Sequence, residues 1–280
     1  MDALKIDLND WELTGGGMLG VSYFHKSDPN LMIKFDLRPK AMEAMQHEIE
    51  VSQNVYDLGV PTPKPGQVVF DGQRYGMMFT RIQNKVSYAR VLADNPGDVD
   101  ALAKEYSDAV RQLHATQCDT QKFHSVKEHY RRYIQAYQHR DDKFKANALA
   151  VLESLPEAST CVHGDLHVGN IIKADGKSYF IDLGEFSYGH PYFDLSMIPA
   201  IIYSWHGRDD LFNNAFHLGE ELFAEFWKHF VNYYFDGTKT VEQAEEELLP
   251  YIALRQLAME FLSGRKKEGE AVERTFKIFL

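Results

Sequence analysis

The chain has 280 residues, which is enough for a large hydrophobic core divided between two lobes or subdomains. Apolar residues make up 44% of it and charged residues 25%, the proportions of an ordinary globular protein. The net charge of −11 disfavours nucleic acid and anionic membrane surfaces as main partners, and it is compatible with a cationic substrate. Two cysteines, Cys118 and Cys161, are too few and too scattered for a disulfide framework or a zinc site.

No stretch approaches the roughly eighteen consecutive apolar residues of a membrane-spanning helix. Residues 1–10 are polar and acidic and do not resemble a signal peptide. We therefore expect a cytoplasmic protein with no membrane partner, and the sequence leaves its oligomeric state open.

The first informative stretch is rich in glycine. Gly15, Gly17 and Gly20 satisfy the pattern G-x-G-x-x-G, and strands are expected over residues 21–24 and 31–35. Glycines let a backbone approach phosphates closely and offer N–H donors to them. The pattern alone is equally typical of a hairpin loop. Because a strand and not a helix follows, it does not fit a dinucleotide-binding unit.

Lys34 lies within the apolar strand over residues 31–35. Such a lysine either keeps an edge strand soluble or pairs with nucleotide phosphates. Residues 39–58 then show helical periodicity, and Glu48 falls on the apolar stripe of this helix. An acid on a buried face needs a cationic partner. We expect Glu48 to pair with Lys34; the alternative is a glutamate at the rim that reaches solvent.

Another hairpin is expected over residues 67–80, with its turn at residues 71–72. Residues 86–155 are mostly helical in pattern. A stripe that begins at Val99 ends at His114, which we expect to be structural.

Residues 160–194 concentrate the candidate catalytic side chains. His163, Asp165 and Asn170 follow a short apolar run. Two further apolar strands flank the turn at residues 174–177, which predicts a hairpin that ends at Asp182. A hairpin brings its outer ends together, so Asn170 and Asp182 should lie close to each other. Oxygen ligands at one mouth suit Mg²⁺, which takes few protein ligands and shares phosphate oxygens.

The spacing of these residues indicates phosphoryl transfer. An Asp followed five positions later by Asn, and then by an Asp that opens an Asp-x-Gly turn, is typical of kinase-type catalysts. In such catalysts the first Asp accepts the hydroxyl proton, and the Asn and second Asp hold the metal. The alternative is that these residues form turns and that His163 is a core histidine. That alternative suits any one of them better than the ordered set.

The segments HGDLHVGN (163–170) and IDLGEF (181–186) resemble the aminoglycoside phosphotransferase and choline kinase family, the small-molecule relatives of protein kinases. The resemblance implies an α+β, two-lobed protein-kinase-like fold. Residues 1–81 would form an N-terminal nucleotide-binding lobe with a small antiparallel sheet. Residues 82–280 would form a larger, mainly helical catalytic and substrate-binding lobe. Protein kinases carry Arg and Lys where this chain has Gly164 and His167, which disfavours a protein kinase.

The resemblance also assigns the site. The expected catalytic residues are Asp165, His163 and His167. ATP would be bound by Gly15, Gly17, Gly20, Lys34 and Glu48, and its adenine by the backbone of the hinge, Arg81 and Ile82. Mg²⁺ would be held by Asn170 and Asp182. Asp194 is expected to hold the catalytic loop by accepting backbone hydrogen bonds.

The sequence therefore predicts an ATP-dependent phosphotransferase that moves the γ-phosphate to a hydroxyl group of a small molecule. The alternative is a catalytically silent nucleotide-binding or scaffold protein on the same fold. The acceptor and the choice between ATP and GTP stay open. Glu185 is either a third acid near the metal or exposed, the role of His190 is open, and the acidic run 245–247 is expected to be a solvated helix face.

Overall fold

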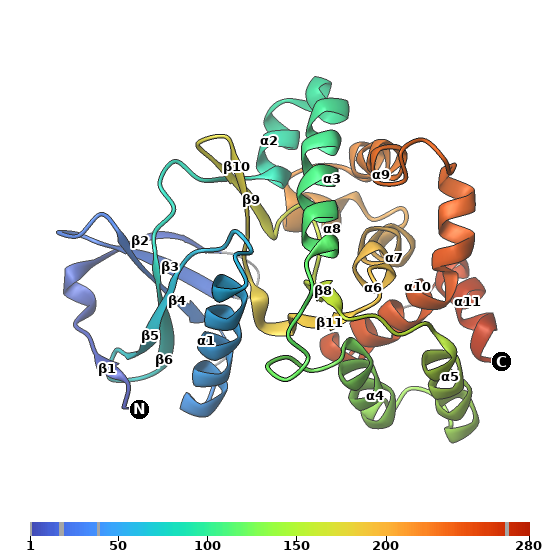
Figure 1. Cartoon of the computed structure of the whole chain (residues 1–280), viewed down its shortest axis with the longest axis horizontal. Helices are drawn as coiled ribbons and strands as arrows, with labels where there is room; N and C mark the ends of the chain where they lie inside the picture. The colour runs from blue at the N-terminus through green and yellow to red at the C-terminus, as the bar shows by residue number, and fades with distance from the viewer. Residues whose placement is uncertain (1, 17–19, 38–39, 267–268) are drawn as a thin grey trace. The chain divides into compact units, whose positions relative to one another are not determined.

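A computed structural model describes residues 2–16, 20–37, 40–266 and 269–280 (Figure 1). They form two compact units. The first comprises Met1–Val86 and Ile172–Gly184, and the second comprises Ser87–Ile171 and Glu185–Leu280. Residues 172–184 thus belong to the first unit, which a division into the contiguous stretches 1–81 and 82–280 does not foresee. The functional division into a nucleotide-binding and a catalytic lobe stays a prediction.

The first unit contains a six-stranded sheet in the order β1-β5-β6-β4-β3-β2 (Figure 1). Its strands are β1 (Leu4–Lys5), β2 (Trp11–Gly16), β3 (Gly20–His25), β4 (Leu31–Asp36), β5 (Pro65–Phe70) and β6 (Tyr75–Thr80). The short β1 runs parallel to β5, and the remaining ladders are antiparallel. The strands predicted over residues 21–24 and 31–35 and the hairpin predicted over residues 67–80 are confirmed.

The two faces of this sheet carry separate apolar clusters. One cluster is made by Trp11, Ile33, Phe35 and Val69. The other is made by Met45, Val68 and Met77. Met45 comes from helix α1 (Met42–Asp57), which packs on β5 and β6 and confirms the helix predicted at about 39–58. Lys34 pairs with Met77 across the β4–β6 ladder. Because directly opposed side chains point to the same face of a sheet, Lys34 emerges on the face that α1 covers.

A second, three-stranded sheet has the order β10-β9-β7. Its strands are β7 (Val86–Ser87), β9 (Ile171–Ala174) and β10 (Lys177–Phe180). Asp175 and Gly176, between β9 and β10, both have left-handed backbones, with φ of 49° and 74°. Two such residues in sequence form the type I′ turn that suits the twist of a hairpin. The hairpin predicted at this position is therefore confirmed.

The second unit is mainly helical. Its helices are α2 (Tyr88–Asp94), α3 (Val99–Ala115), α4 (Val126–Ala136), α5 (Asp142–Ser154), α6 (Tyr192–Leu195), α7 (Met197–Trp205), α8 (Asp209–Phe216), α9 (Glu220–Tyr234), α10 (Val241–Ser263) and α11 (Glu270–Phe276). Its two-stranded sheet pairs β8 (Thr160–Val162) with β11 (Ser187–Gly189). Short 3₁₀ turns occur in the chain at Leu8–Asp10, Pro96–Asp98, Leu183–Glu185 and Lys277–Phe279.

Aromatic packing holds the centre of the second unit. The ring of Tyr106 on α3 meets the rings of Phe226 and Phe230 on α9 edge to face, with centroids 5.2 and 5.5 Å apart. The predicted α3 stripe is buried from Val99 to His114. A second cluster joins α4, α5, α10 and α11. Val162 of β8 belongs to this cluster, which ties the strand before the candidate loop to these helices.

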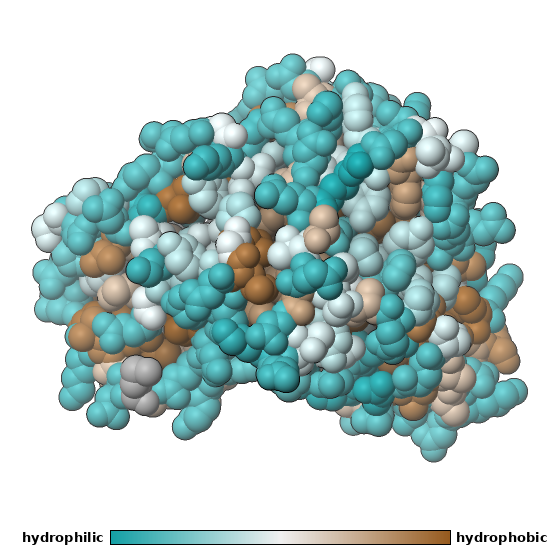
Figure 2. Space-filling view, viewed as in Figure 1, coloured by the Kyte–Doolittle hydropathy of each residue, from teal (hydrophilic) through white to brown (hydrophobic). Residues whose placement is uncertain are grey.

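The face of the molecule shown in Figure 2 is predominantly polar. In the face shown in Figure 2, hydrophobic residues occupy separate small patches among hydrophilic ones. Among the helices that the structure describes, none combines the length and the apolar character needed to cross a bilayer.

Candidate active site

One group of predicted site residues lies in the first unit, where Lys34 of β4 meets Asp182. Lys34 Nζ donates a hydrogen bond to Asp182 Oδ1. Asp182 follows β10 and has a left-handed backbone, φ 60°, which non-glycine residues seldom adopt. Burial disfavours the charged amine, but Asp182, followed by Glu48 and Asp36, outweighs it and raises the pKa of Lys34. Lys34 is therefore a cation at neutral pH.

Glu48 lies near this pair but binds a different lysine. Its Oε2 accepts a hydrogen bond from Lys40 Nζ at 3.0 Å, and Lys40 also reaches Asp36 Oδ2 at 2.6 Å. The predicted ion pair between Glu48 and Lys34 was therefore wrong, because Lys40 takes the carboxylate of Glu48 while Lys34 takes Asp182. Glu48 still contacts the Asp-Leu-Gly turn, since a Cβ built on Gly184 would lie 3.6 Å from its Cδ.

The glycine-rich turn joins β2 to β3. Gly17 lies outside the described residues. Gly15 pairs with Ser22 in the ladder. Gly20 packs closely on β4: a Cβ there would lie 2.9 Å from Phe35 O and 3.3 Å from Lys34 Cε. A side chain at this position would push against Lys34, so Gly20 supports the placement of the lysine.

The predicted hinge follows β6. The N–H of Arg81 donates to Asn30 O at 2.7 Å. The guanidinium lies 3.6 Å from the centroid of the Phe24 ring, a cation–π contact. Arg81 is thus fixed to β3 and to the turn before β4, and its backbone donor is occupied. Ile82 follows it in irregular backbone.

Another group of predicted site residues lies in the loop after β8, in the second unit. Asn170 Nδ2 donates to Asp165 Oδ2 and to Asp165 O, both at 2.9 Å. These bonds orient the amide so that Oδ1 points away from the Asp165 carboxylate. His167 Nε2 lies 3.7 Å from Asp165 Oδ2, and the Asp165 side chain is 43% exposed. The loop thus presents an open carboxylate next to an oriented amide oxygen.

Asp194 of α6 holds the backbone of this loop. Its Oδ2 accepts from the N–H of His163 at 2.7 Å, and its Oδ1 accepts from the N–H of Gly164 at 2.8 Å. His114 Nε2 lies 3.0 Å from Oδ2. Although burial favours the neutral acid, the bond and charge of His114 lower the pKa of Asp194. The predicted roles of Asp194 and His114 are confirmed.

His163 is fully buried, and its Nδ1 accepts from the N–H of Asp165 at 3.2 Å. The buried His163 ring therefore helps to fix the backbone of the loop at Asp165. Sequence reasoning grouped His163 and His167 together, but their surroundings differ, because His167 stands beside the exposed carboxylate of Asp165.

Gly164 and Glu185 are in close contact. Gly164 has φ 86°, and a Cβ there would lie 2.3 Å from Glu185 O. The Glu185 side chain is bound by α4: His129 Nδ1 lies 2.9 Å away, and Tyr133 donates its hydroxyl at 2.5 Å. Burial opposes ionisation, but these two bonds outweigh it and lower the pKa of Glu185. The Glu185 side chain is 41% exposed, and a role for it near the metal stays a prediction. The spacing of His129 and Tyr133, one helical turn apart, was the available signal for this contact.

The acidic run at the start of α10 was expected to be a solvated helix face. Glu246 and Glu247 are exposed, as expected, whereas Glu245 is partly buried. Glu245 accepts hydrogen bonds from Trp227 Nε1 at 2.9 Å and from the Tyr203 hydroxyl. Glu247 binds Lys239 and accepts from the Tyr192 hydroxyl at 2.8 Å.

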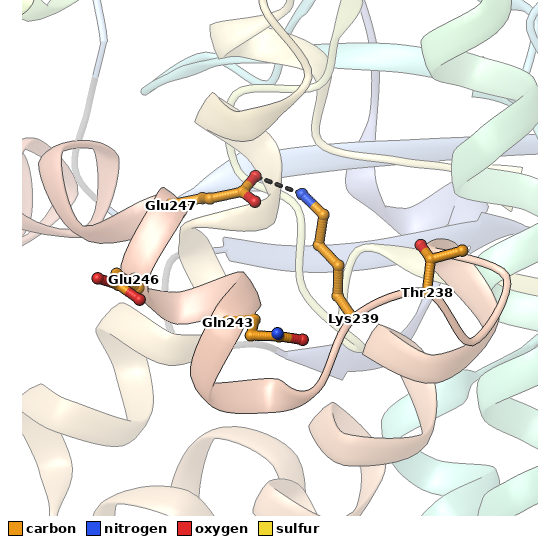
Figure 3. A pocket seen from close by; sticks show the side chains of 5 residues that line it. All are labelled: Thr238, Lys239, Gln243, Glu246 and Glu247. Carbon is orange, nitrogen blue, oxygen red and sulfur yellow. Dashed lines mark hydrogen bonds and ion pairs between the residues drawn. The ribbon is translucent and has the colours of Figure 1, made fainter.

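A pocket of about 470 Å³ opens beside this run. It is lined by Thr238, Lys239, Gln243, Glu246 and Glu247. Figure 3 shows the ammonium group of Lys239 directed at Glu247. None of the predicted site residues lines this pocket, and we assign it no function.

The donor atoms in these two groups of residues suit a hard cation. Within the described ranges, no group of three or more His, Cys, Asp or Glu side chains forms a metal cluster. The candidate donors are instead the amide oxygen of Asn170 and the carboxylate of Asp182. Mg²⁺ is commonly bound by one or two such oxygen ligands, with phosphates and waters completing its shell. Each of these two side chains, taken within its own unit, is therefore of a type that can bind Mg²⁺.

An antiparallel sheet bearing a paired strand lysine, together with a helical unit bearing a braced Asp–Asn loop, defines the class of kinase-like phosphotransferases. The model of the phosphotransferase enzyme family matches residues 11–235 of the chain. The chain belongs to this family. The predicted family and the predicted α+β, protein-kinase-like fold are confirmed. No protein with a curated description matches the chain.

Solved structures of kinases share the fold. A thermostable mutant of aminoglycoside phosphotransferase APH(4)-Ia, in ternary complex with ADP and hygromycin B, matches with a TM-score of 0.62 and 12% identity over 96% of this chain and 92% of that one. An amicoumacin kinase in complex with AMP-PNP and Ca²⁺ matches at 0.59 and 14%, over 99% and 90%. The choline kinase LicA from Streptococcus pneumoniae matches at 0.56 and 16%, over 96% and 92%. At these identities the likeness shows the fold alone.

Proposed function

We propose that this protein transfers the γ-phosphate of ATP to a hydroxyl group of a small molecule. The observation that carries the proposal is the Asp165–Asn170 pair, which lies in a loop whose backbone is fixed by the buried Asp194. The nucleotides named in the complexes of similar structures, ADP and AMP-PNP, support ATP as the donor.

Asp165 acts as the catalytic base. Its exposed carboxylate would orient the acceptor hydroxyl and take its proton as the phosphoryl group is transferred. His167, at 3.7 Å, is the second side chain within reach of the acceptor. His163 contributes by positioning, since its ring holds the N–H of Asp165 from inside the fold.

Asn170 and Asp182 would hold Mg²⁺ through oxygen atoms. When bound, the metal would bridge the nucleotide phosphates and neutralise charge that develops during transfer. Asn170 is prepared for this role by its two bonds to Asp165, which aim its amide oxygen. Because these ligands belong to different units, the proposal requires the units to present both to one metal ion during turnover.

Lys34 would orient the nucleotide phosphates, with Glu48 adding to the field that keeps its amine charged. Gly15, Gly17 and Gly20 would cover the phosphates with backbone N–H donors. At the hinge, the Arg81 N–H is already bonded to Asn30, so Ile82 would supply the backbone donor to the base.

The acceptor class is a hydroxyl compound such as an aminoglycoside, an amino alcohol, a sugar or a nucleoside. The net charge of −11 favours acceptors that carry amino groups. Hygromycin B, amicoumacin and choline, after which similar structures are named or described, are therefore the first compounds to test.

The proposal is tested by coupled ADP release over a panel of such acceptors. Replacing Asp165 with Asn should leave Mg-ATP affinity within about twofold, because Asp165 is assigned to the acceptor, and should lower turnover by about 10²–10⁴-fold. Asp175→Asn, an exposed turn substitution in the β9–β10 hairpin, is the matched control and should keep full activity. Full turnover by Asp165→Asn would refute the assignment. Nucleotide binding by the wild type, without ADP release for any acceptor, would favour the silent alternative.

A further inference from the structure

Phe216, the last residue of α8, packs against His167 of the candidate catalytic loop. The centroids of the two rings are 5.2 Å apart, and their planes are inclined by 63°. Phe216 is buried, and two rings from other helices fix it in place. Phe223 of α9 stacks on it with centroids 5.0 Å apart, and Trp205 of α7 lies at 5.9 Å. The aromatic core of the second unit therefore supports the side chain of His167 directly.

Gly169 also borders the imidazole ring of His167. A Cβ built on Gly169 would lie 3.0 Å from both Cε1 and Nδ1 of that ring, so a side chain there would press on it. The N–H of Gly169 donates a hydrogen bond to His167 Nδ1 at 3.1 Å. An imidazole nitrogen that accepts a hydrogen bond carries no hydrogen, and the hydrogen of the neutral ring is therefore on Nε2.

The nitrogen that carries this hydrogen is the one beside the proposed base. His167 Nε2 lies 3.7 Å from Asp165 Oδ2, and the same oxygen accepts from Asn170 Nδ2 at 2.9 Å. Within the part of the chain that the structure describes, no group donates a hydrogen bond to Asp165 Oδ1. The donors thus gather at Oδ2 and restrict the rotation of the carboxylate, and Oδ1 is left open to the acceptor hydroxyl.

We propose that Phe216 is a positioning residue for phosphoryl transfer, which holds the His167 ring with Nε2–H beside Asp165 Oδ2 and so assigns Oδ1 as the oxygen that takes the proton. The inference rests on the proposed function, and it adds a residue of the helical region that belongs to none of the motifs. In the transfer, the acceptor oxygen forms its bond to the γ-phosphorus, the bond from that phosphorus to the bridging oxygen of ADP breaks, and the hydroxyl proton moves to Oδ1. Phe216 acts through His167 and not on the reacting atoms.

Phe212 supplies a matched control. It lies one turn earlier on α8, is fully buried, and contacts the same two rings, Trp205 and Phe223. The ring contacts of Phe212 do not include His167. Replacing either phenylalanine with leucine removes similar packing, so Phe216→Leu and Phe212→Leu should lower the melting temperature by similar amounts.

Coupled ADP release by the full chain, over the acceptor panel given above, separates the two variants. Phe216→Leu should lower kcat about tenfold and leave the KM for Mg-ATP within about twofold, because only the geometry at the base changes. Phe212→Leu should keep kcat within about twofold. In a His167→Ala background, Phe216→Leu should cost less than about twofold more, because the ring that it positions is gone.

Nitrogen-15 NMR of the imidazole rings reads the positioning without an acceptor, at a pH where the rings are neutral. The His167 signals, identified by their loss in His167→Ala, should show a hydrogen on Nε2 and none on Nδ1 in the wild type and in Phe212→Leu. Phe216→Leu should show a mixture of both tautomers.

Equal losses of kcat in the two leucine variants would overturn the proposal. So would a wild-type His167 with its hydrogen on Nδ1, or a Phe216→Leu protein with the tautomer and kcat of the wild type. A wild type that releases no ADP with any acceptor would overturn the proposed function, and the tautomers would then decide the positioning of the ring on their own.

Discussion

Replacing Asp194 with Asn tests whether one buried carboxylate holds the catalytic loop. The carboxylate accepts from the N–H groups of His163 and Gly164 and lies 3.0 Å from His114 Nε2. Asn has the same shape but one acceptor oxygen, so a backbone N–H would face an NH₂ group. Hydrogen bonds to charged groups contribute about 1.5–3 kcal/mol each, and an unsatisfied buried donor costs about 1–3 kcal/mol. We expect a loss of about 3–5 kcal/mol in the free energy of unfolding, out of roughly 5–15 kcal/mol for a typical domain.

Urea denaturation followed by circular dichroism measures this loss. The control is Asp108→Asn on α3, which removes an exposed ion pair with Lys104 and should change stability by less than about 1 kcal/mol. ADP release by the folded fraction of Asp194→Asn should also fall, because the backbone of the loop is no longer fixed. An Asp194→Asn protein as stable as the control, or one with wild-type turnover, would refute the reasoning.

Two further predictions concern the same loop. Gly164→Ala should lower the free energy of unfolding by about 2–5 kcal/mol, because alanine is strained in the left-handed backbone and its Cβ would clash with Glu185 O. It should also reduce turnover more than Mg-ATP affinity. A melting curve identical to that of the wild type would contradict this prediction. The pKa of Asp194 is lowered in the folded state. Its ionisation therefore contributes fully to the free energy of unfolding above the unfolded pKa of about 3.9, and this contribution is lost as the pH falls through the folded pKa. Unfolding free energies measured below about pH 4 should therefore fall less steeply in Asp194→Asn than in the wild type.

The sequence was sufficient to predict features that depend only on neighbouring residues. The turn at Asp175 and Gly176 follows from residue types that tolerate positive φ. The buried stripe of α3 follows from helical periodicity. The role of Asp194 required the resemblance, because no local rule connects it with the N–H groups of residues 163 and 164.

Contacts between segments that are far apart in the sequence were harder to predict. Periodicity placed Glu48 on the correct side of α1 but could not choose between Lys34 and Lys40, since that choice depends on the reach of each side chain. The hydrogen bonds of Glu185 and Glu245 were not predicted, because their partners come from other helices. Charge runs in sequence do not reveal whether an aromatic hydroxyl or indole N–H from a neighbouring helix meets the carboxylate.

The bonds from His163 and Gly164 to Asp194 join residues 31 and 30 positions apart. They fix the two ends of the intervening chain, which includes the β9–β10 hairpin, to each other. Residues inserted at the exposed tip of the hairpin, Asp175–Gly176, would lengthen the turn without pulling on residues 163, 164 and 194. The tip is therefore the position at which we expect a short inserted peptide to be tolerated.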